Sequence, residues 1–390
     1  MNPSESVTRV LVPIGALGLG VDAGDVQRGI AAGAHAIACD AGSTDSGPAY
    51  LARGVAKYSR AAIKTDLKIL MKARHEAGIP LLIGSCGTSG NDKALDWTVE
   101  VALEIARELG QSPRIAVLYS EQGRQDMADA VRQGLVAPLP PMQGAEPSLF
   151  LECDHIVALM GPEPYIAALE AGADIVLGGR TTDTAVLAAM PLMRGAGAGA
   201  AWHAGKVAEC GALCSVKPRE GGVVIHVGQD GFEIEPLRPG NACTPYTVSA
   251  HMLYENSNPF HLHEPGGVLD VTQAQYEALD ERRVRVTGSV FEPRPYTMKL
   301  EGAASGGFQT VMLVGIRDRH VLGHIDRFLE KMHQVLGERV RAAMGDAAEG
   351  CHISLRPYGW NAVSGTPVPA GTPAPQEIGL LFIATASTQE

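Results

Sequence analysis

Residues 79 to 92 read Ile79-Pro-Leu-Leu-Ile-Gly-Ser-Cys-Gly-Thr-Ser-Gly-Asn-Asp92, an apolar strand followed by a turn of glycine and hydroxyl side chains and then by the start of a helix. Apolar strands also precede Asp40-Ala-Gly-Ser-Thr-Asp-Ser-Gly47 and Gly178-Gly-Arg-Thr-Thr-Asp-Thr184. Strands followed by polar turns and helices are typical of a parallel sheet, which binds ligands at the carboxyl ends of its strands. We therefore expect the three turns to meet around one pocket for a small anionic or polyol-like molecule.

The first 190 residues alternate apolar strands with helical patterns. The predicted strands are 9–15, 35–40, 79–84, 114–119, 155–161 and 174–178. Between them, helices are predicted over 64–77 and 92–109, where apolar residues recur every three or four positions and Asn91 can cap the second helix. The sequence predicts an α/β fold whose N-terminal domain is a parallel, doubly wound, Rossmann-like sheet; a closed barrel is the alternative, but six units fall short of eight.

The second half has a different pattern, with β-rich segments at 221–228, 231–237, 283–291 and 309–316 and helices at 247–255 and 323–344. A glycine- and alanine-rich stretch, residues 194–201, precedes it. We therefore predict a parallel α/β domain over residues 1–195 and an α+β domain over residues 196–390 that completes the cleft. The last apolar strand, 379–386, is expected to pair at a sheet edge or to be covered by another chain.

Composition limits the class of protein. The 390 residues are 45% hydrophobic, the net charge is -11, and no stripe of Lys and Arg is present, so nucleic acid is not an expected partner. The sequence has no 18-residue apolar run and no signal-peptide pattern, so we expect a cytoplasmic protein without membrane contact. Seven scattered cysteines are interpreted as reduced core thiols.

Two carboxylates in the first turn are candidates for proton transfer. Asp40 and Asp45 lie five residues apart across a Gly-Ser-Thr turn. Such a pair can hold a divalent metal or divide the roles of acid and base. The alternative is a capped turn, since Ser43, Thr44 and Asp45 are all good helix N-caps.

The turn from Gly84 to Gly90 could hold a carboxylate or phosphate with its backbone N–H groups at a helix N-terminus. It is not a Walker loop and lacks the G-x-G-x-x-G spacing; Gly15-Ala-Leu-Gly-Leu-Gly20 only approximates a dinucleotide fingerprint. Cys86 could be a nucleophile, but an ordinary polar-turn cysteine is favoured because no histidine is near in sequence.

Later motifs add a cation and more acids. Arg180 could bind a substrate carboxylate while Asp183 orients it or acts as a base; an ion pair between domains is the alternative. Glu209, beside a glycine turn, is a further candidate base. Lys299 and Glu301 share one face of a strand, either as a solvated pair or as a contribution to the cleft.

Two segments resemble metal sites. The spacing Cys210-x3-Cys214 is unusual for structural zinc and has no second pair nearby. His261-Leu-His263-Glu264 could supply metal ligands, but surface polar residues are the favoured interpretation. No cofactor is predicted; a divalent metal remains compatible with the acidic residues.

The predicted site therefore has two groups. The catalytic residues are Asp40, Asp45, Asp183 and Glu209. The substrate-binding residues are Ser43, Thr44, Ser85, Cys86, Gly87, Thr88, Arg180, Thr181, Thr182 and Lys299.

The chain resembles the acyclic terpene utilisation AtuA family. The motifs that carry the resemblance are the three turns above together with Gly161-Pro-Glu-Pro-Tyr165, Glu209-Cys-Gly-Ala-Leu213, Glu264-Pro-Gly-Gly267, Lys299-Leu-Glu-Gly-Ala303 and Arg356-Pro-Tyr-Gly-Trp-Asn361. The resemblance implies a place in terpenoid catabolism and, from the genes that accompany such families, a substrate among organic acids and their CoA thioesters. It transfers no catalytic residue. It also implies that a small partner subunit can accompany the chain.

These observations predict a catabolic enzyme that acts on a small carboxylic acid or its CoA thioester, a lyase of hydratase or dehydratase type that uses carboxylates as acid and base and an arginine as anchor. The alternatives are a hydrolase with Ser85 or Cys86 as nucleophile and a non-catalytic ligand-binding large subunit. We expect a homo-oligomer, with a small partner protein as a further possibility.

Overall fold

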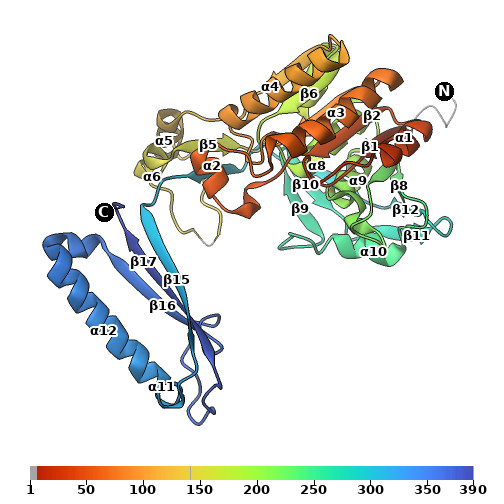
Figure 1. Cartoon of the computed structure of the whole chain (residues 1–390). Helices are drawn as coiled ribbons and strands as arrows, with labels where there is room; N and C mark the ends of the chain where they lie inside the picture. The colour runs from red at the N-terminus through yellow and green to blue at the C-terminus, as the bar shows by residue number, and fades with distance from the viewer. Residues whose placement is uncertain (1–6, 141, 390) are drawn as a thin grey trace. The chain divides into compact units, whose positions relative to one another are not determined.

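The computed structural model describes residues 7–140 and 142–389. The chain divides into two compact units, of which unit 1 ends at Ala304 and unit 2 begins at Ser305. The strands of unit 2 form a sheet that is separate from those of unit 1 (Figure 1).

Unit 1 is built on a nine-stranded sheet with the order β11-β12-β8-β7-β1-β2-β3-β6-β4. Its parallel part consists of β1 (Thr8–Val12), β2 (Ala36–Asp40), β3 (Leu81–Gly84), β6 (Ile175–Gly178) and β4 (Ile115–Leu118). The strands β7 (Val223–Val227), β8 (Gly231–Pro236), β12 (Val284–Thr287) and β11 (Gln275–Ala278) extend it in antiparallel pairs. The predicted α/β class, with a parallel strand-helix sheet, is confirmed.

Helices cover both faces of this sheet. The helices α1 (Ala23–Ala31), α3 (Arg60–Ala77) and α4 (Asp92–Leu109) pack on one face, whereas α8 (Asp183–Met193) and α9 (Ala198–Ala208) pack on the other. Successive strand residues point to opposite faces, so fully buried strands such as β2 and β3 supply apolar side chains to both cores. This arrangement places the turns that follow the parallel strands at one edge of the sheet.

The helix boundaries follow local sequence signals. The side chain of Asn91 accepts a hydrogen bond from the backbone N–H of Ala94 and so caps α4, as predicted. The same helix ends at Gly110, which has the left-handed conformation with φ of 62°.

One predicted strand of the parallel sheet lies elsewhere. Strand β5 (His155–Ala158) pairs antiparallel with β14 (Leu300–Ala303) in a separate two-stranded sheet. The chain that leaves β4 turns toward β5, where the backbone N–H of Gln122 donates to the carbonyl of Ile156 at 2.8 Å. Five of the six predicted strands are therefore parallel strands of the large sheet, and the sixth, β5, is not.

The chain does not divide near residue 195. The glycine-rich stretch there is the short connection between α8 and α9, and these two helices pack together. Strand β7 then pairs with β1 along Thr8–Val12, so residues well beyond 195 complete the first sheet instead of forming an α+β domain of their own. The division observed after Ala304 directly follows β14, which pairs with β5 of unit 1.

Smaller elements complete unit 1. The strands β9 (His261–Glu264), β10 (Gly267–Asp270) and β13 (Val290–Pro293) form an antiparallel sheet in which β10 is central. The remaining helices are α2 (Ala49–Arg53), α5 (Arg124–Arg132), α6 (Pro147–Glu152), α7 (Glu163–Glu170) and α10 (Pro245–His251).

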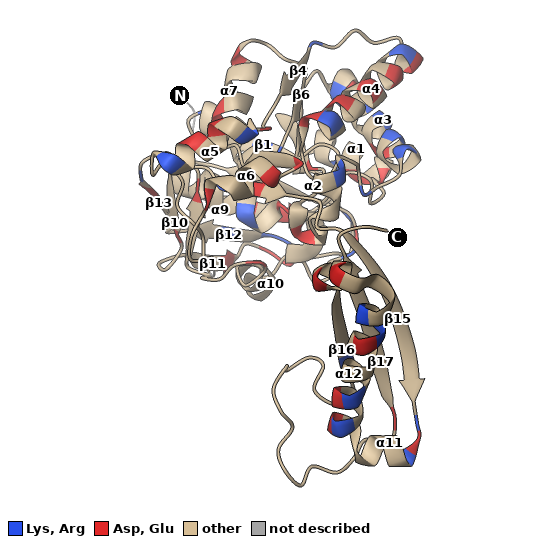
Figure 2. Cartoon of the chain, turned by 90° about the vertical axis from the view of Figure 1, so that its left-hand side faces the viewer, with Lys and Arg blue, Asp and Glu red and all other residues tan. Residues whose placement is uncertain are grey.

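Unit 2 is a three-stranded antiparallel sheet with two helices. The strand β17 (Ile378–Ala386) lies between β15 (Phe308–Ile316) and β16 (His352–Tyr358), so the first of the two alternatives predicted for it, a place at a sheet edge, was wrong. The helix α11 (Arg319–Gly323) leads into α12 (Ile325–Met344), along which acidic and basic residues are interspersed (Figure 2). Among the described residues, no helix combines the length and apolar character needed to cross a membrane.

Candidate functional site

Two cavities lie in unit 1 at the edge of the sheet where the parallel strands end. The first has a volume of about 550 Å³ and the second about 830 Å³. They share three acidic lining residues, Asp45, Asp183 and Glu255, so the two spaces adjoin. Both volumes suit a small organic molecule.

The structure brings many of the predicted site residues to these cavities. The first cavity is lined by Asp45, Arg180, Thr182, Asp183, Glu209 and Lys299. The second is lined by Asp40, Ser43, Asp45, Thr88 and Asp183. The predicted residues that line neither cavity are Thr44, Ser85, Cys86, Gly87 and Thr181.

The acidic residues are positioned by strand ends and helix starts. Asp40 is the last residue of β2, and the side chain of Ser43 caps the short 3₁₀ helix that contains Asp45. Thr182 caps α8 through a hydrogen bond from the backbone N–H of Ala185 at 3.2 Å, and Asp183 occupies the first turn of that helix. Carboxylates are favourable there because the helix N-terminus carries partial positive charge.

The first residues of the turn from Gly84 to Gly90 are bonded to the end of the neighbouring strand β6. The backbone N–H groups of Ser85 and Cys86 donate to the carbonyls of Gly179 and Gly178, at 3.0 and 2.9 Å. Both side chains are fully buried, and burial raises the pKa of the Cys86 thiol. From this turn, only Thr88 lines a cavity.

Arg180 is held in place by acidic and hydroxyl groups. Its Nε donates to Glu301 at 2.9 Å, and Nη1 reaches the Ser85 hydroxyl at 3.1 Å and Asp183 at 3.5 Å. Burial disfavours the charge of Arg180, but Glu301 and Asp183 outweigh it and raise the pKa of the guanidinium. Lys299 also pairs with Glu301, at 2.8 Å, and its side chain is 47% exposed. The geometry favours the ion-pair interpretation for Arg180 and leaves Lys299 as the more accessible cation.

Burial changes the protonation of several carboxyl groups. Asp40 is 5% exposed; its Oδ2 accepts from the backbone N–H of Gly42 at 2.7 Å, while Oδ1 has no hydrogen-bond partner. Burial, followed by the nearby charge of Asp183, raises the pKa of Asp40 well above its ordinary value. Burial likewise raises the pKa of Asp183.

Glu264, at the end of β9, is a candidate proton-transfer residue that sequence reasoning did not select. It lines the first cavity, and its buried Oε2 has no hydrogen-bond partner. Burial raises the pKa of Glu264 to about 7, although the hydroxyls of Thr182 and Thr184 lower it in part. The motif Glu264-Pro-Gly-Gly267 is recognisable in the sequence, but only the fold places Glu264 at the wall of the first cavity.

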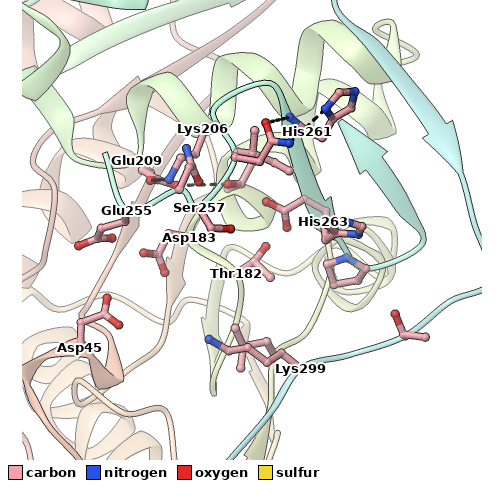
Figure 3. A pocket seen from close by; sticks show the side chains of 18 of the residues that line it. Asp45, Thr182, Asp183, Lys206, Glu209, Glu255, Ser257, His261, His263 and Lys299 are labelled. Atoms are coloured by element: carbon pink, nitrogen blue, oxygen red, sulfur yellow. Dashed lines mark hydrogen bonds and ion pairs between the residues drawn. The ribbon is translucent and has the colours of Figure 1, made fainter. Parts of the chain in front are cut away.

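A buried ion pair forms another wall of the first cavity. Lys206 and Glu209 pair three residues apart, and Thr184 donates to Glu209 Oε2 at 3.2 Å. Burial lowers the pKa of Lys206, but the negative charge of Glu209 outweighs it and the net pKa is raised. Figure 3 shows Lys206 and Glu209 close together near Asp183 and Glu255, with Lys299 approaching from a separate segment.

One group of side chains could hold a metal ion. Ligand atoms of Glu209, Cys210 and His251 lie within 4.8 Å of one another. The segment 261–264, for which surface polar residues were the favoured interpretation, is not such a group in the described part of the chain, although His261, His263 and Glu264 all line the first cavity. Cys214 also lies apart, donating to the carbonyl of Gly211.

Comparison with known proteins identifies the family. The family model described as acyclic terpene utilisation family protein AtuA matches residues 49–352, which is well over half of the chain. The chain therefore belongs to this family, as the sequence motifs predicted. No curated protein matches the chain, and no solved structure matches it.

Proposed function

We propose that this member of the acyclic terpene utilisation family is a lyase of hydratase or dehydratase type that acts on a small carboxylic acid or its CoA thioester. Family membership suggests a role in acyclic terpene utilisation and leaves the reaction open. The reaction class is inferred from the carboxyl groups around the two cavities.

The observation that carries the proposal is Glu264, with an unpartnered carboxyl oxygen at the first cavity and a pKa raised to about 7. A group with a pKa near neutrality is suited to give and take a proton. In the dehydration, one carboxylate removes the proton next to the substrate carbonyl, and a protonated carboxyl donates a proton to the departing hydroxyl, so that water leaves. Glu264 and Asp183 are the proposed pair, with Asp45 and Asp40 nearby.

The second cavity supports the choice of substrate. Ile14, Leu19, Val21 and Leu213 contribute apolar surface to it beside polar and charged residues, whereas the first cavity has few apolar side chains. A molecule with a reacting polar end and a methyl-branched hydrocarbon chain matches this division, since buried apolar surface contributes roughly 0.8 kcal/mol per CH₂.

Lys299 is the proposed anchor for the substrate carboxylate or thioester carbonyl. Its side chain is 47% exposed at the first cavity and its ammonium pairs with Glu301, whereas the buried Arg180 donates to Glu301, Ser85 and Asp183. Arg180 is then a positioning residue that holds Glu301, which in turn holds Lys299. This assignment replaces the predicted arginine anchor.

The proposal is tested with hydroxy acids, unsaturated acids and their CoA thioesters, each with straight and methyl-branched chains of increasing length. Glu264→Gln is expected to lower kcat about 10²- to 10⁴-fold for the substrate that turns over. Glu277→Gln, at an exposed position on β11, is the matched control and should keep the wild-type rate. The kcat/KM values should rise with the length of the apolar chain.

Full activity of Glu264→Gln on such a substrate contradicts the role of Glu264. Ligand-dependent thermal stabilisation without turnover of any compound would instead support a ligand-binding subunit.

A further inference from the structure

We infer that Glu209, Cys210 and His251 form a binding site for one Zn²⁺ ion at the wall between the two cavities. This inference concerns metal binding alone and does not depend on the reaction proposed above.

Three different elements of the fold bring the ligands together. Glu209 and Cys210 follow the end of α9, and His251 is the last residue of α10, which packs against the short 3₁₀ helix after Cys210. The ligand atoms of the three side chains all lie within 4.8 Å of one another. Around a tetrahedral Zn²⁺ such atoms lie roughly 3.3 to 3.8 Å apart, so shifts of about 1 Å are sufficient to close the site.

His251 provides an independent indication of a ligand. It is 4% exposed, and its Nε2 has no hydrogen-bond partner, which is costly for a buried polar atom. The imidazole stacks on Tyr254 with ring centroids 5.5 Å apart. A buried histidine that is held by stacking and keeps one ring nitrogen without a partner is suited to bind a metal ion.

The donor set favours zinc over the harder cations. One thiolate, one imidazole and one carboxylate are zinc ligands, whereas Mg²⁺ and Ca²⁺ prefer oxygen alone. Glu209 lines the first cavity and Cys210 the second, so an ion held by them faces space on both sides. Three protein ligands and one open position are the pattern of catalytic rather than structural zinc sites.

Lys206 does not exclude the ion. It pairs with Glu209 Oε1, and Thr184 donates to Oε2, but each carboxylate oxygen has a second lone pair. The pair with Lys206 also keeps Glu209 in a fixed position next to Cys210.

The test uses the untagged full chain after treatment with a chelator. Calorimetric titration with Zn²⁺ should give one ion per chain. Co²⁺ in place of Zn²⁺ should give a near-ultraviolet thiolate-to-cobalt absorption band, which reports bonding to a cysteine without any assay of activity.

Single substitutions identify the ligands. Cys210→Ser should abolish the cobalt band, and His251→Ala should weaken Zn²⁺ binding at least about tenfold. Cys351→Ser, in unit 2, and His263→Ala, at the first cavity, are the controls and should keep both the band and the affinity. Circular dichroism checks that each variant is folded.

Three results would overturn the inference: no stoichiometric Zn²⁺ binding by the wild-type chain, a cobalt complex of the wild-type chain without the thiolate band, or a band that survives Cys210→Ser and is lost in His263→Ala. The first two need no variant, so misfolding of a variant cannot hide the answer.

Discussion

Burial controls the chemistry of the carboxyl groups that line the two cavities. Asp40, Asp183 and Glu264 all have raised pKa values because the charged form loses water, and Asp40 and Glu264 each keep one buried oxygen without a partner. Glu301 shows the opposite behaviour: burial alone would raise its pKa, but Arg180 and Lys299 lower it to about 2. The pKa values of these carboxyl groups thus differ because the groups have different neighbours.

The raised pKa of Glu264 predicts a stability that depends on pH. The ordinary pKa of 4.5 applies to the unfolded chain and about 7 to the folded chain, so between these values only the folded protein keeps the proton. Stability from this group is therefore full below pH 4.5 and is lost as the pH rises toward 7 and beyond. Glu264→Gln removes the effect, and its stability relative to the wild type should rise by up to about 3 kcal/mol from pH 4.5 to pH 7.5.

Urea unfolding at a series of pH values measures this difference. Glu277→Gln, at an exposed position, should show no such trend. A difference between Glu264→Gln and wild type that stays constant with pH would mean that Glu264 titrates normally.

At the scale of elements, the turn after β3, residues 84–90, stabilises the edge of the sheet where the two cavities lie. Gly90 has a φ of 64°, and its carbonyl accepts from the backbone N–H of Arg180 at 3.1 Å. This contact sets the start of the next turn, from which Arg180, Thr182 and Asp183 reach the first cavity. The turn predicted to bind the ligand therefore supports the residues that do line the cavity.

Gly90→Ala is expected to destabilise unit 1 by about 3 kcal/mol or more, because the added Cβ would lie 2.2 Å from the Arg180 backbone nitrogen in addition to the left-handed strain. Gly110→Ala is the matched control, with a φ of 62° and no atom within 4 Å, and should cost only about 1 kcal/mol. Denaturant unfolding measures both. Equal losses of unfolding free energy in the two variants would show that the close approach of Gly90 to Arg180 does not contribute.

On the scale of the whole molecule, both cavities are lined only by residues of unit 1. Unit 2 has a separate small core that includes Leu322, Ile325 and Ile378. The family match, residues 49–352, includes parts of both units. The position of the site thus depends on the first sheet and its antiparallel extension.

Two truncated chains test where the independent folding unit ends. A chain that stops at Ala304 should unfold in one cooperative transition with a urea midpoint close to that of unit 1 in the full chain. A chain that stops at residue 195 should fail to fold, because it lacks β7, which pairs with β1, and α9, which packs on α8. Circular dichroism follows both, and cooperative folding of the shorter chain would restore the boundary predicted from the sequence.

Local patterns in the sequence were sufficient for the strand-turn-helix units, for the Asn91 cap of α4, and for the family. They also selected acids such as Asp45 and Asp183, which follow strand ends and so must lie at one edge of a parallel sheet. These features depend on neighbours within a few residues or on the geometry that all parallel sheets share. The fold class and part of the candidate site could be read from them for that reason.

Long-range contacts were beyond the reach of such patterns. Arg180 finds its partner Glu301 across 121 residues, β7 joins β1 across the whole first half of the chain, and His251 meets Cys210 from another helix. Burial, which raises the pKa of Glu264, and pairing, which occupies Arg180, arise only when distant segments pack together. Tertiary packing therefore determines which side chains bind, which transfer protons and which only hold their neighbours, since each role depends on solvent exclusion and on partners that are remote in sequence.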